Sequence, residues 1–170
     1  LSAGNYYGQG VTQAEAEAWY AAHKDNAKEP KWIGLNSQLA KDDNGEIIER
    51  VYRVGSLYGE ALAKVVENLK AALPYAESEQ QKSVIEKLIE VNETGDLDAF
   101  NQYCIAWVQD NSQVDFINGF TETYGDPLGI TGTWESMVNF KNIAATSRTR
   151  ILSDNALWFE RHSTTDPKYK

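Results

Sequence analysis

Several residue types are scarce in this chain of 170 residues, which has one cysteine, one methionine, two histidines and four prolines. The single cysteine, Cys104, excludes an internal disulfide. It lies in the apolar stretch 103–108, and the sequence offers it neither a neighbouring histidine nor a basic pocket. We therefore predict a buried structural thiol rather than a catalytic one. No apolar run approaches the roughly 18 residues that a membrane span requires.

Basic residues are also few. The 16 Lys and Arg face 25 Asp and Glu, which gives a net charge of −9 and a pI near 4.7. Nucleic-acid backbones and anionic membrane surfaces are bound through basic patches. We therefore expect no nucleic acid and no membrane among the partners, and we expect ligands that are cationic or carry an amine.

Core-forming residues, in contrast, are plentiful. Hydrophobic residues make up 42% of the chain, with five Trp and nine Tyr, and 170 residues is a usual length for one domain. We predict a single domain over residues 1–170. Because the chain starts at Leu1 without a methionine, we also expect it to be a piece of a larger protein.

The N-terminal third predicts one helix and one hairpin. In the segment 1–31, Thr12 and Glu15 have the spacing of a capping box, which predicts a helix that ends near Lys24. The segment 32–54 predicts a β-hairpin that starts at Trp32 and turns at Asp-Asp-Asn-Gly, since Asn-Gly tolerates the backbone of a tight turn. Two strands alone are marginal in water, so we expect this hairpin to belong to a larger sheet.

The segment 56–170 is predicted to be helical. One apolar stripe ends at Pro74, a second helix is capped by Ser78 with Gln81 and closed by Gly95, and a third is capped by Asp96 or Asp98. A long amphipathic stretch from Trp134 to Phe159 predicts the last helix. The expected fold is mainly α with a small β-hairpin, an α+β class with a helical, bundle-like body.

The most informative stretch is Asp115 to Glu135, in which aromatic and acidic residues surround an Asp-Pro pair. Phe116, Ile117 and Phe120 have helical spacing, and Thr133 is placed to cap a new helix whose first turn carries Glu135. The intervening loop, 120–135, would be compact because three glycines give its backbone freedom. We predict that this loop, held between two helices, projects carboxylates and a phenol into one small volume.

The same stretch closely resembles the dipeptidyl peptidase III family. The family pattern is a Gly-Phe-(Ile/Thr)-Glu-(Ser/Thr)-Tyr-x-Asp-Pro-x-Gly run followed by Gly-x-(Phe/Trp)-Glu, read here as Gly119, Phe120, Glu122, Tyr124, Asp126, Pro127, Gly129, Gly132, Trp134 and Glu135. Upstream, the resemblance continues at Asn5-Tyr6-Tyr7, at 35–39 and at 106–110. It covers essentially all 170 residues.

The resemblance implies a zinc exopeptidase that removes dipeptides from the N-termini of short peptides. It places the chain in the lobe of a two-lobed enzyme that does not bind zinc, with the remaining lobe as its partner, and it favours a cytoplasmic location. The family holds zinc through a His-Glu-x-x-Gly-His helix, which His23 and His162 cannot form, and catalytic zinc needs three protein ligands. We therefore expect zinc in the parent protein, none bound by this fragment, and no activity of the fragment alone.

The resemblance also assigns three site residues. Glu122 would pair with the free ammonium of the peptide, as a carboxylate is suited to do. Tyr124 would support the oxyanion of the tetrahedral intermediate, and Glu135 would line the substrate pocket. Each residue also has a purely structural interpretation. Glu122 could be a solvated or locally bonded acid, and Tyr124 a packed aromatic. Glu135 could be an acid favoured by a helix N-terminus. Asp126 is assigned to the turn, because Asp before Pro commonly bonds its own loop.

Two other classes of function stay open. A non-catalytic helical module could bind peptides or sugars through exposed Trp and Tyr side chains. Core packing is the default for tryptophans on apolar helix faces, where the pattern places Trp19, Trp107, Trp134 and Trp158. A purely structural domain without a ligand is the third possibility.

Overall fold

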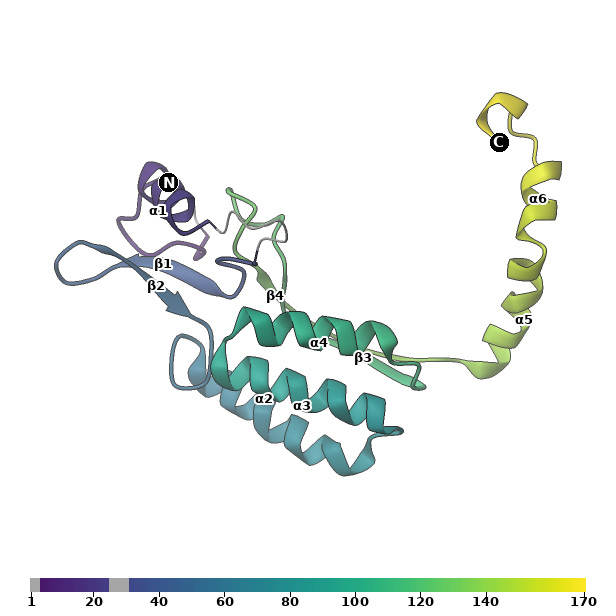
Figure 1. Ribbon diagram of the computed structural model, residues 1–170, viewed down its shortest axis with the longest axis horizontal. Helices are drawn as coiled ribbons and strands as arrows, with labels where there is room; N and C mark the ends of the chain where they lie inside the picture. The colour runs from purple at the N-terminus through teal and green to yellow at the C-terminus, as the bar shows by residue number, and fades with distance from the viewer. Residues whose placement is uncertain (1–3, 25–30) are drawn as a thin grey trace. The chain divides into compact units, whose positions relative to one another are not determined.

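The computed structural model describes residues 4–24 and 31–170 (Figure 1). Its helices and strands are, in chain order, α1 (Gln13–His23), β1 (Ser37–Lys41), β2 (Ile47–Val51), α2 (Gly59–Ala72), η1 (Leu73–Tyr75), α3 (Glu79–Thr94), α4 (Leu97–Gln109), β3 (Val114–Glu122), β4 (Thr133–Phe140), α5 (Ile143–Asp154), α6 (Ala156–His162) and η2 (Pro167–Tyr169). The fold is therefore mainly helical and α+β, as predicted, with two antiparallel strand pairs where the sequence predicted one.

Contacts divide the chain into two units. The first comprises Leu1–Ser112 and Ile117–Met137, and the second comprises Gln113–Phe116 and Val138–Lys170. The prediction of one domain over the whole chain stays a prediction.

Helices α2, α3 and α4 form the helical body of the first unit, with α3 packed against both neighbours (Figure 1). Their buried side chains follow the predicted helical periodicity and include Leu62, Val66, Val84, Ile85, Leu88, Ile89 and Tyr103. Val108, in the apolar stretch 103–108, is an exception, since it is 74% exposed at the end of α4. Cys104 is half-buried rather than fully buried, and burial raises the pKa of its thiol.

The predicted helix ends are largely confirmed. Ser78 Oγ accepts a hydrogen bond from the backbone N–H of Gln81, and Gly95 closes α3 with a left-handed φ of 72°. Asp96, not Asp98, caps α4. The second half of the Ser78 capping box differs, because the Gln81 side chain accepts from the N–H of Glu77 at 2.7 Å and not from that of Ser78.

The first hairpin is shorter than predicted. β1 and β2 pair antiparallel with Ser37 opposite Val51, and Asp42 Oδ1 accepts the N–H groups of Asn44 and Glu46 in the turn. β1 does not begin at Trp32, because Gly34 takes a φ of 74° and its carbonyl accepts from the N–H of Ser37, which forms a turn.

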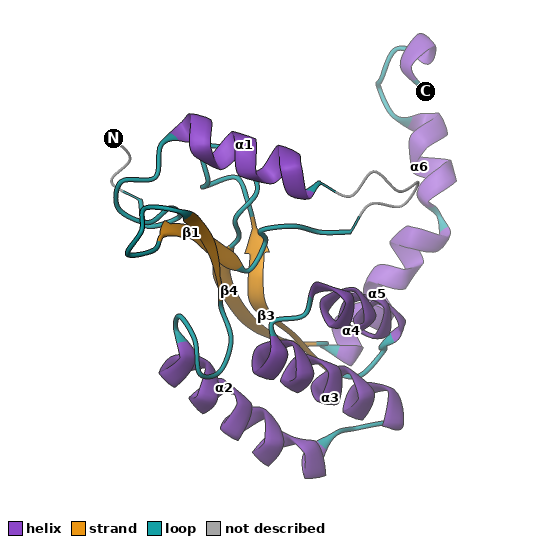
Figure 2. Cartoon of the chain, turned by 60° about the vertical axis from the view of Figure 1, so that its left-hand side comes forward, coloured by secondary structure: helices purple, strands orange, loops and turns teal. Residues whose placement is uncertain are grey.

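Helix α1 covers the first hairpin, as Figure 2 shows. Ala16 and Tyr20 form a buried cluster with Leu39 of β1. Beyond β1, the N–H of Gly8 donates to the carbonyl of Leu39 at 2.7 Å. The N-terminal segment thus contacts β1, although within residues 4–24 and 31–170 the hairpin remains a two-stranded sheet.

The stretch Asp115 to Glu135 was predicted wrongly at its two ends. Phe116, Ile117 and Phe120 lie in strand β3, and Thr133 begins strand β4, so the loop connects two strands and not two helices. Short runs of aromatic and β-branched residues fit helical and strand spacing alike, and strand propensity prevails here. The hydroxyl of Thr133 does not cap a helix but donates to the carbonyl of Glu122 at 3.0 Å.

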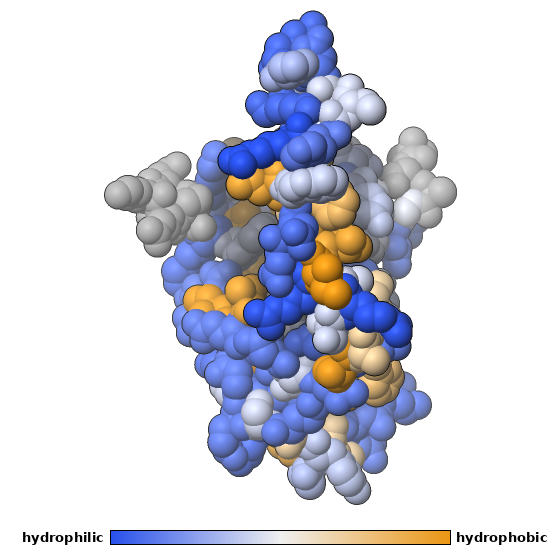
Figure 3. Space-filling view, turned by 90° about the vertical axis from the view of Figure 1, so that its right-hand side faces the viewer, coloured by the Kyte–Doolittle hydropathy of each residue, from blue (hydrophilic) through white to orange (hydrophobic). Residues whose placement is uncertain are grey.

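The second unit contains α5 and α6, neither of which buries a residue. Its exposed apolar side chains include Val138, Phe140, Ile143, Ile151, Leu152, Leu157, Trp158 and Phe159. The space-filling view in Figure 3 shows hydrophobic residues exposed among hydrophilic ones. The predicted helix from Trp134 is therefore two shorter helices after a strand.

Loss of the α3 cap should destabilise the protein. We expect Ser78→Ala to lower the free energy of unfolding by about 1 kcal/mol, because the N–H of Gln81 loses its acceptor. Urea denaturation followed by circular dichroism measures this. The matched control is Ser83→Ala in the second turn of α3, which should be neutral or slightly stabilising because alanine has the higher helix propensity. Equal losses at both positions would contradict the capping role.

The ion pair of Glu15 should make stability depend on pH. Glu15 Oε1 lies 2.7 Å from Lys41 Nζ, and the Thr12 N–H and hydroxyl donate to Oε2. The hydrogen bond from Lys41, followed by those from Thr12, lowers the pKa of this carboxyl to about 2. Because the folded pKa lies below the unfolded one, the stabilisation is complete above about pH 4.3 and is lost as the pH falls toward 2. The stability difference between wild type and Glu15→Gln, measured by urea denaturation from pH 2 to 7, should therefore shrink on acidification; a growing difference would contradict this.

Candidate functional site

The candidate site lies at the end of hairpin β3–β4, in the loop 123–132. The N–H of Asp126 donates to the carbonyl of Thr123 at 3.1 Å, which closes a four-residue turn around Tyr124 and Gly125. The Tyr124 side chain is 85% exposed. In the part of the chain that the structure describes, no residue makes a hydrogen bond or ring contact with this side chain, so the backbone of the turn alone positions the phenol.

Asp126 organises the loop. It is 5% exposed, and both oxygens of its carboxylate are used. Oδ1 accepts the N–H of Leu128 at 3.2 Å, and Oδ2 accepts the N–H groups of Ile130 and Thr131 at 2.8 and 2.9 Å. Oδ2 also accepts the hydroxyl of Tyr7 at 3.0 Å. The assignment of Asp126 to the turn is confirmed, and a buried charge with this many donors is well compensated.

Two tyrosines from the N-terminal segment and α1 support the loop. The hydroxyl of Tyr20 lies 3.5 Å from that of Thr131, which is fully buried. Burial raises the pKa of Tyr7 and of Tyr20, and for Tyr7 the neighbouring Tyr20 and Asp126 raise it further. Both phenols therefore stay protonated and able to donate near neutral pH.

The loop glycines act in two ways. Gly129 takes a left-handed φ of 68° and supplies the predicted backbone freedom. Gly132 is needed for close packing instead, because a Cβ there would lie 2.9 Å from the Leu35 carbonyl oxygen and 2.9 Å from the backbone of Phe120. At Gly125 a Cβ would lie 2.2 Å from the Tyr6 hydroxyl. The local sequence does not reveal these close contacts, because they involve residues far away in the chain.

The two predicted acids are half-buried on neighbouring strands. Glu135 Oε2 accepts the hydroxyl of Thr121 at 3.2 Å. The carboxylate of Glu122 has no side-chain donor among residues 4–24 and 31–170, and it ends the strand that leads into the turn of Tyr124. The structure thus gathers Glu122, Tyr124 and Glu135 on one hairpin, although it joins none of them to another by a hydrogen bond.

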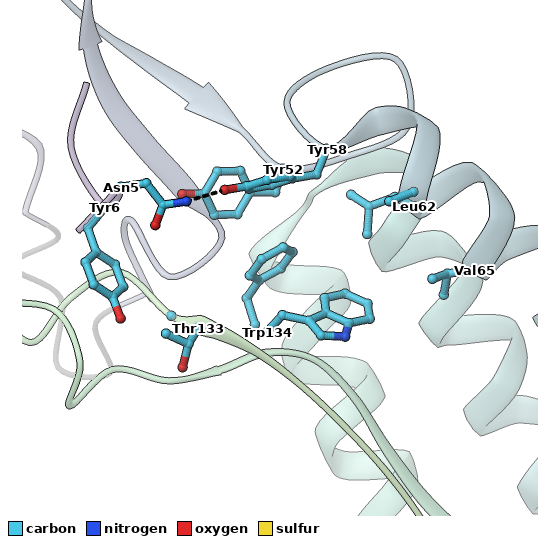
Figure 4. Close-up of a pocket in the computed structure, with 11 residues that line it drawn as sticks. Asn5, Tyr6, Tyr52, Tyr58, Leu62, Val65, Thr133 and Trp134 are labelled. Atoms are coloured by element: carbon cyan, nitrogen blue, oxygen red, sulfur yellow. Dashed lines mark hydrogen bonds between the residues drawn. The ribbon is translucent and has the colours of Figure 1, made fainter. Parts of the chain in front are cut away.

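An aromatic pocket of about 450 Å³ opens beside this hairpin (Figure 4). Its walls are Asn5, Tyr6, Tyr52, Tyr58, Ala61, Leu62, Val65, Phe120, Gly132, Thr133 and Trp134. The Phe120 ring packs edge-on against Trp134 at 5.1 Å, and Asn5 Nδ2 donates to the Tyr58 hydroxyl at 2.9 Å. Trp134 therefore lies on a strand and is 39% exposed, which corrects its predicted place in the core of a helical face; Trp158, also predicted to pack, is 55% exposed.

No cluster of three or more His, Cys, Asp or Glu able to hold a metal occurs in the described ranges. His23 stacks on Trp19 and His162 on Trp158, each with Nδ1 2.8 Å from the carbonyl of that tryptophan. These residues do not fit a zinc site. In the same ranges, no helix is both long enough and apolar enough to cross a membrane.

Sequence reasoning missed Tyr7, Tyr6 and Tyr20 as parts of the site. Tyr7 lies 119 residues from Asp126 in the chain, so no local spacing connects them. The available signal was the family resemblance at Asn5-Tyr6-Tyr7, which marked the segment without giving it a role.

Comparison with known proteins shows which protein family this chain belongs to. Residues 5–161 match peptidase family M49, so the fold and the hairpin motif are those of part of a peptidase. The chain belongs to peptidase family M49, and its resemblance to the dipeptidyl peptidase III family is confirmed. It is similar to dipeptidyl peptidase 3 of Dictyostelium discoideum, with 38% identity over 112 residues, 64% of this chain and 16% of that protein. Its identity with dipeptidyl peptidase 3 of Homo sapiens is 34% over 92 residues, 54% of this chain and 12% of that protein.

Solved structures show the same fold. Dipeptidyl-peptidase III from Corallococcus sp. strain EGB superposes with a TM-score of 0.69 and 21% identity, over 97% of this chain and 30% of that chain. DPP III from Caldithrix abyssi superposes with a TM-score of 0.71 and 20% sequence identity, over 93% of this chain and 29% of that chain. The chain thus spans less than a third of the length of these relatives.

Close packing at Gly132 should make it sensitive to a single methyl group. We expect Gly132→Ala to lower the free energy of unfolding by about 1–3 kcal/mol, because the new Cβ meets backbone atoms that cannot turn away. Gly125→Ala should cost less, since its nearest neighbour is the mobile end of the Tyr6 side chain. Urea denaturation of both variants compares them, and a greater loss at Gly125 would contradict the packing shown by the loop.

Proposed function

We infer that this chain is part of a zinc-dependent dipeptidyl peptidase that releases dipeptides from the N-termini of short peptides, and that it contributes one wall of the substrate cleft. The inference depends on one observation above all. The matched Glu-x-Tyr-x-Asp-Pro motif stands at an ordered hairpin end, where Tyr124 is exposed and the carboxylate of Glu122 has no side-chain donor within the described residues. Two groups open to a ligand are thereby held on one rigid element.

Glu122 would bind the N-terminal ammonium of the substrate. A half-buried carboxylate gains a charge-assisted hydrogen bond from an ammonium and remains uncompensated when a neutral mid-chain amide takes its place. This difference selects the end of a peptide over its middle. The chain's net charge of −9 also favours ligands that carry an amine.

Tyr124 would donate its hydroxyl to the oxygen of the scissile carbonyl as negative charge develops there. A donor aimed at that oxygen stabilises the transition state more than the ground state, which accelerates the reaction.

Glu135 would line the substrate pocket. Its hydrogen bond from Thr121 orients the carboxylate from the neighbouring strand, and its burial is intermediate. One oxygen is thus occupied by the protein, and the other is available to a polar group of the peptide.

Zinc would be held by residues of the parent protein outside this chain. The residues described here do not fit a zinc site, so we expect the fragment to be inactive alone. The peptide substrate and the remaining lobe are its proposed partners, and the cytoplasmic location remains an expectation from the family resemblance.

One observation favours a second candidate function. The pocket of about 450 Å³ has five aromatic side chains and no charged residue in its lining. Aromatic rings in such a pocket can contact an apolar side chain of a peptide or the apolar face of a sugar, and on this reading the chain would be a peptide- or sugar-binding module without catalysis. This second function would be supported if the chain bound a peptide or a sugar while the parent protein released no dipeptides.

Replacing Tyr124 should slow catalysis. We expect Tyr124→Phe in the full-length parent, with zinc present, to lower kcat for a dipeptidyl-naphthylamide by about 10²–10³, because one oxyanion donor is lost. The fragment alone should release no naphthylamine. An active fragment, or an unchanged kcat in Tyr124→Phe, would contradict the proposed role.

Replacing Glu122 should weaken binding of the amine. We expect Glu122→Gln to raise KM for the same substrate by about 10–100-fold, since a hydrogen bond to a charged group contributes about 1.5–3 kcal/mol. The matched control is Glu86→Gln on the exposed face of α3, which should leave KM unchanged. If N-acetylated and free peptides bound to wild type equally well, Glu122 would not recognise the ammonium.

A further inference from the structure

We propose that Tyr7 and Asp126 are positioning residues for Tyr124: a hydrogen bond between two distant parts of the chain sets where that phenol stands. The proposal rests on the proposed function, in which Tyr124 acts on the substrate. Neither Tyr7 nor Asp126 has to touch the substrate in this role.

The exposed position of Tyr124 makes such support necessary. Its side chain is 85% exposed and is held by no hydrogen bond or ring contact in the part of the chain that the structure describes. A phenol on a free loop would sample many positions and lose most of the benefit of orientation. Its location must therefore come from the backbone of the turn from Thr123 to Asp126.

That turn ends at Asp126, whose buried carboxylate anchors the loop. The N–H of Asp126 closes the turn on Thr123, and its carbonyl accepts the N–H of Gly129 at 2.9 Å, so two consecutive turns share this residue. Its carboxylate then accepts three further N–H groups of the loop. Rotation of the Asp126 side chain would break all three at once, which makes the loop a single rigid piece.

Tyr7 fixes this piece to the rest of the unit. Its hydroxyl donates to Asp126 Oδ2 at 3.0 Å from a segment whose neighbour, Gly8, bonds to Leu39 of β1. Tyr6 lies against Gly125, next to Tyr124 itself, where even a Cβ would approach its hydroxyl to 2.2 Å. Consecutive residues of the N-terminal segment thus lie against the two residues that follow Tyr124, and of these contacts the Tyr7–Asp126 hydrogen bond is the one that fixes the loop.

The other end of the loop is held separately. The N–H of Gly132 donates to the carbonyl of Leu35 at 2.7 Å, and Thr133 donates to the carbonyl of Glu122 at 3.0 Å. Loss of the Tyr7 hydroxyl should therefore loosen the loop around Tyr124 without releasing the strands. The effect of Tyr7→Phe should be local, and the fold should persist.

The test is a double-mutant cycle in the zinc-loaded full-length parent. If Tyr7 acts through Tyr124, Tyr7→Phe should lower kcat about tenfold or more with KM unchanged, as expected for a donor moved by a fraction of an ångström. In the Tyr124→Phe background the same change should lower kcat no further, because the positioned hydroxyl is already absent. Tyr75→Phe, an 84% exposed tyrosine on η1, is the matched control and should change neither constant.

A second measurement does not depend on activity. Amide hydrogen exchange should be faster at Leu128, Ile130 and Thr131 in Tyr7→Phe than in wild type, with exchange in α3 unchanged. The positioning role is overturned if exchange in the loop is unchanged, if kcat falls equally in both backgrounds, or if the change appears in KM alone. Faster loop exchange in a parent that releases no dipeptides would instead overturn the proposed function and leave the anchor intact, so the two failures are distinguishable.

Discussion

The buried carboxylate of Asp126 is the interaction on which the candidate site depends. One side chain accepts three backbone N–H groups and the hydroxyl of Tyr7, and its own backbone takes part in two successive turns. A carboxylate that is 5% exposed is tolerated only when donors compensate its charge. Because the carboxylate must accept these hydrogen bonds, the loop is held in one conformation. That conformation determines where the exposed Tyr124 lies.

In the candidate site, buried groups support the loop and more exposed groups are available to a ligand. Of the hydrogen-bonded groups, Asp126 and Thr131 are buried and Tyr7 is half-buried. Of the three groups assigned to the substrate, Glu122 and Tyr124 have no side-chain partner in the part of the chain described, and Glu135 accepts one hydrogen bond, from Thr121. Rigid support with open functional groups is what orientation-dependent chemistry requires, and here the support comes from residues more than a hundred positions away in the chain.

The sequence predicted the helical elements well because their signals are local. Thr12 with Glu15, Ser78 with the N–H of Gln81, and Gly95 at a left-handed helix end each involve neighbours within four residues. The strands β3 and β4 were missed, because runs such as Phe116, Ile117 and Phe120 fit two periodicities and only pairing with a distant strand decides between them. The turn role of Asp126 was predicted from Asp-Pro, whereas its bond to Tyr7 and the tight packing of Gly132 arise from tertiary contacts that no spacing encodes.

A structure of the full-length parent with a slowly cleaved peptide bound would test the cleft-wall proposal most directly. The proposal predicts that the N-terminal nitrogen of the peptide lies within hydrogen-bond distance of the Glu122 carboxylate, about 2.7–2.9 Å for a charge-assisted pair. It also predicts that the Tyr124 hydroxyl points to the carbonyl oxygen of the second residue. A peptide bound with its N-terminus away from this hairpin, or held only in the aromatic pocket, would contradict it.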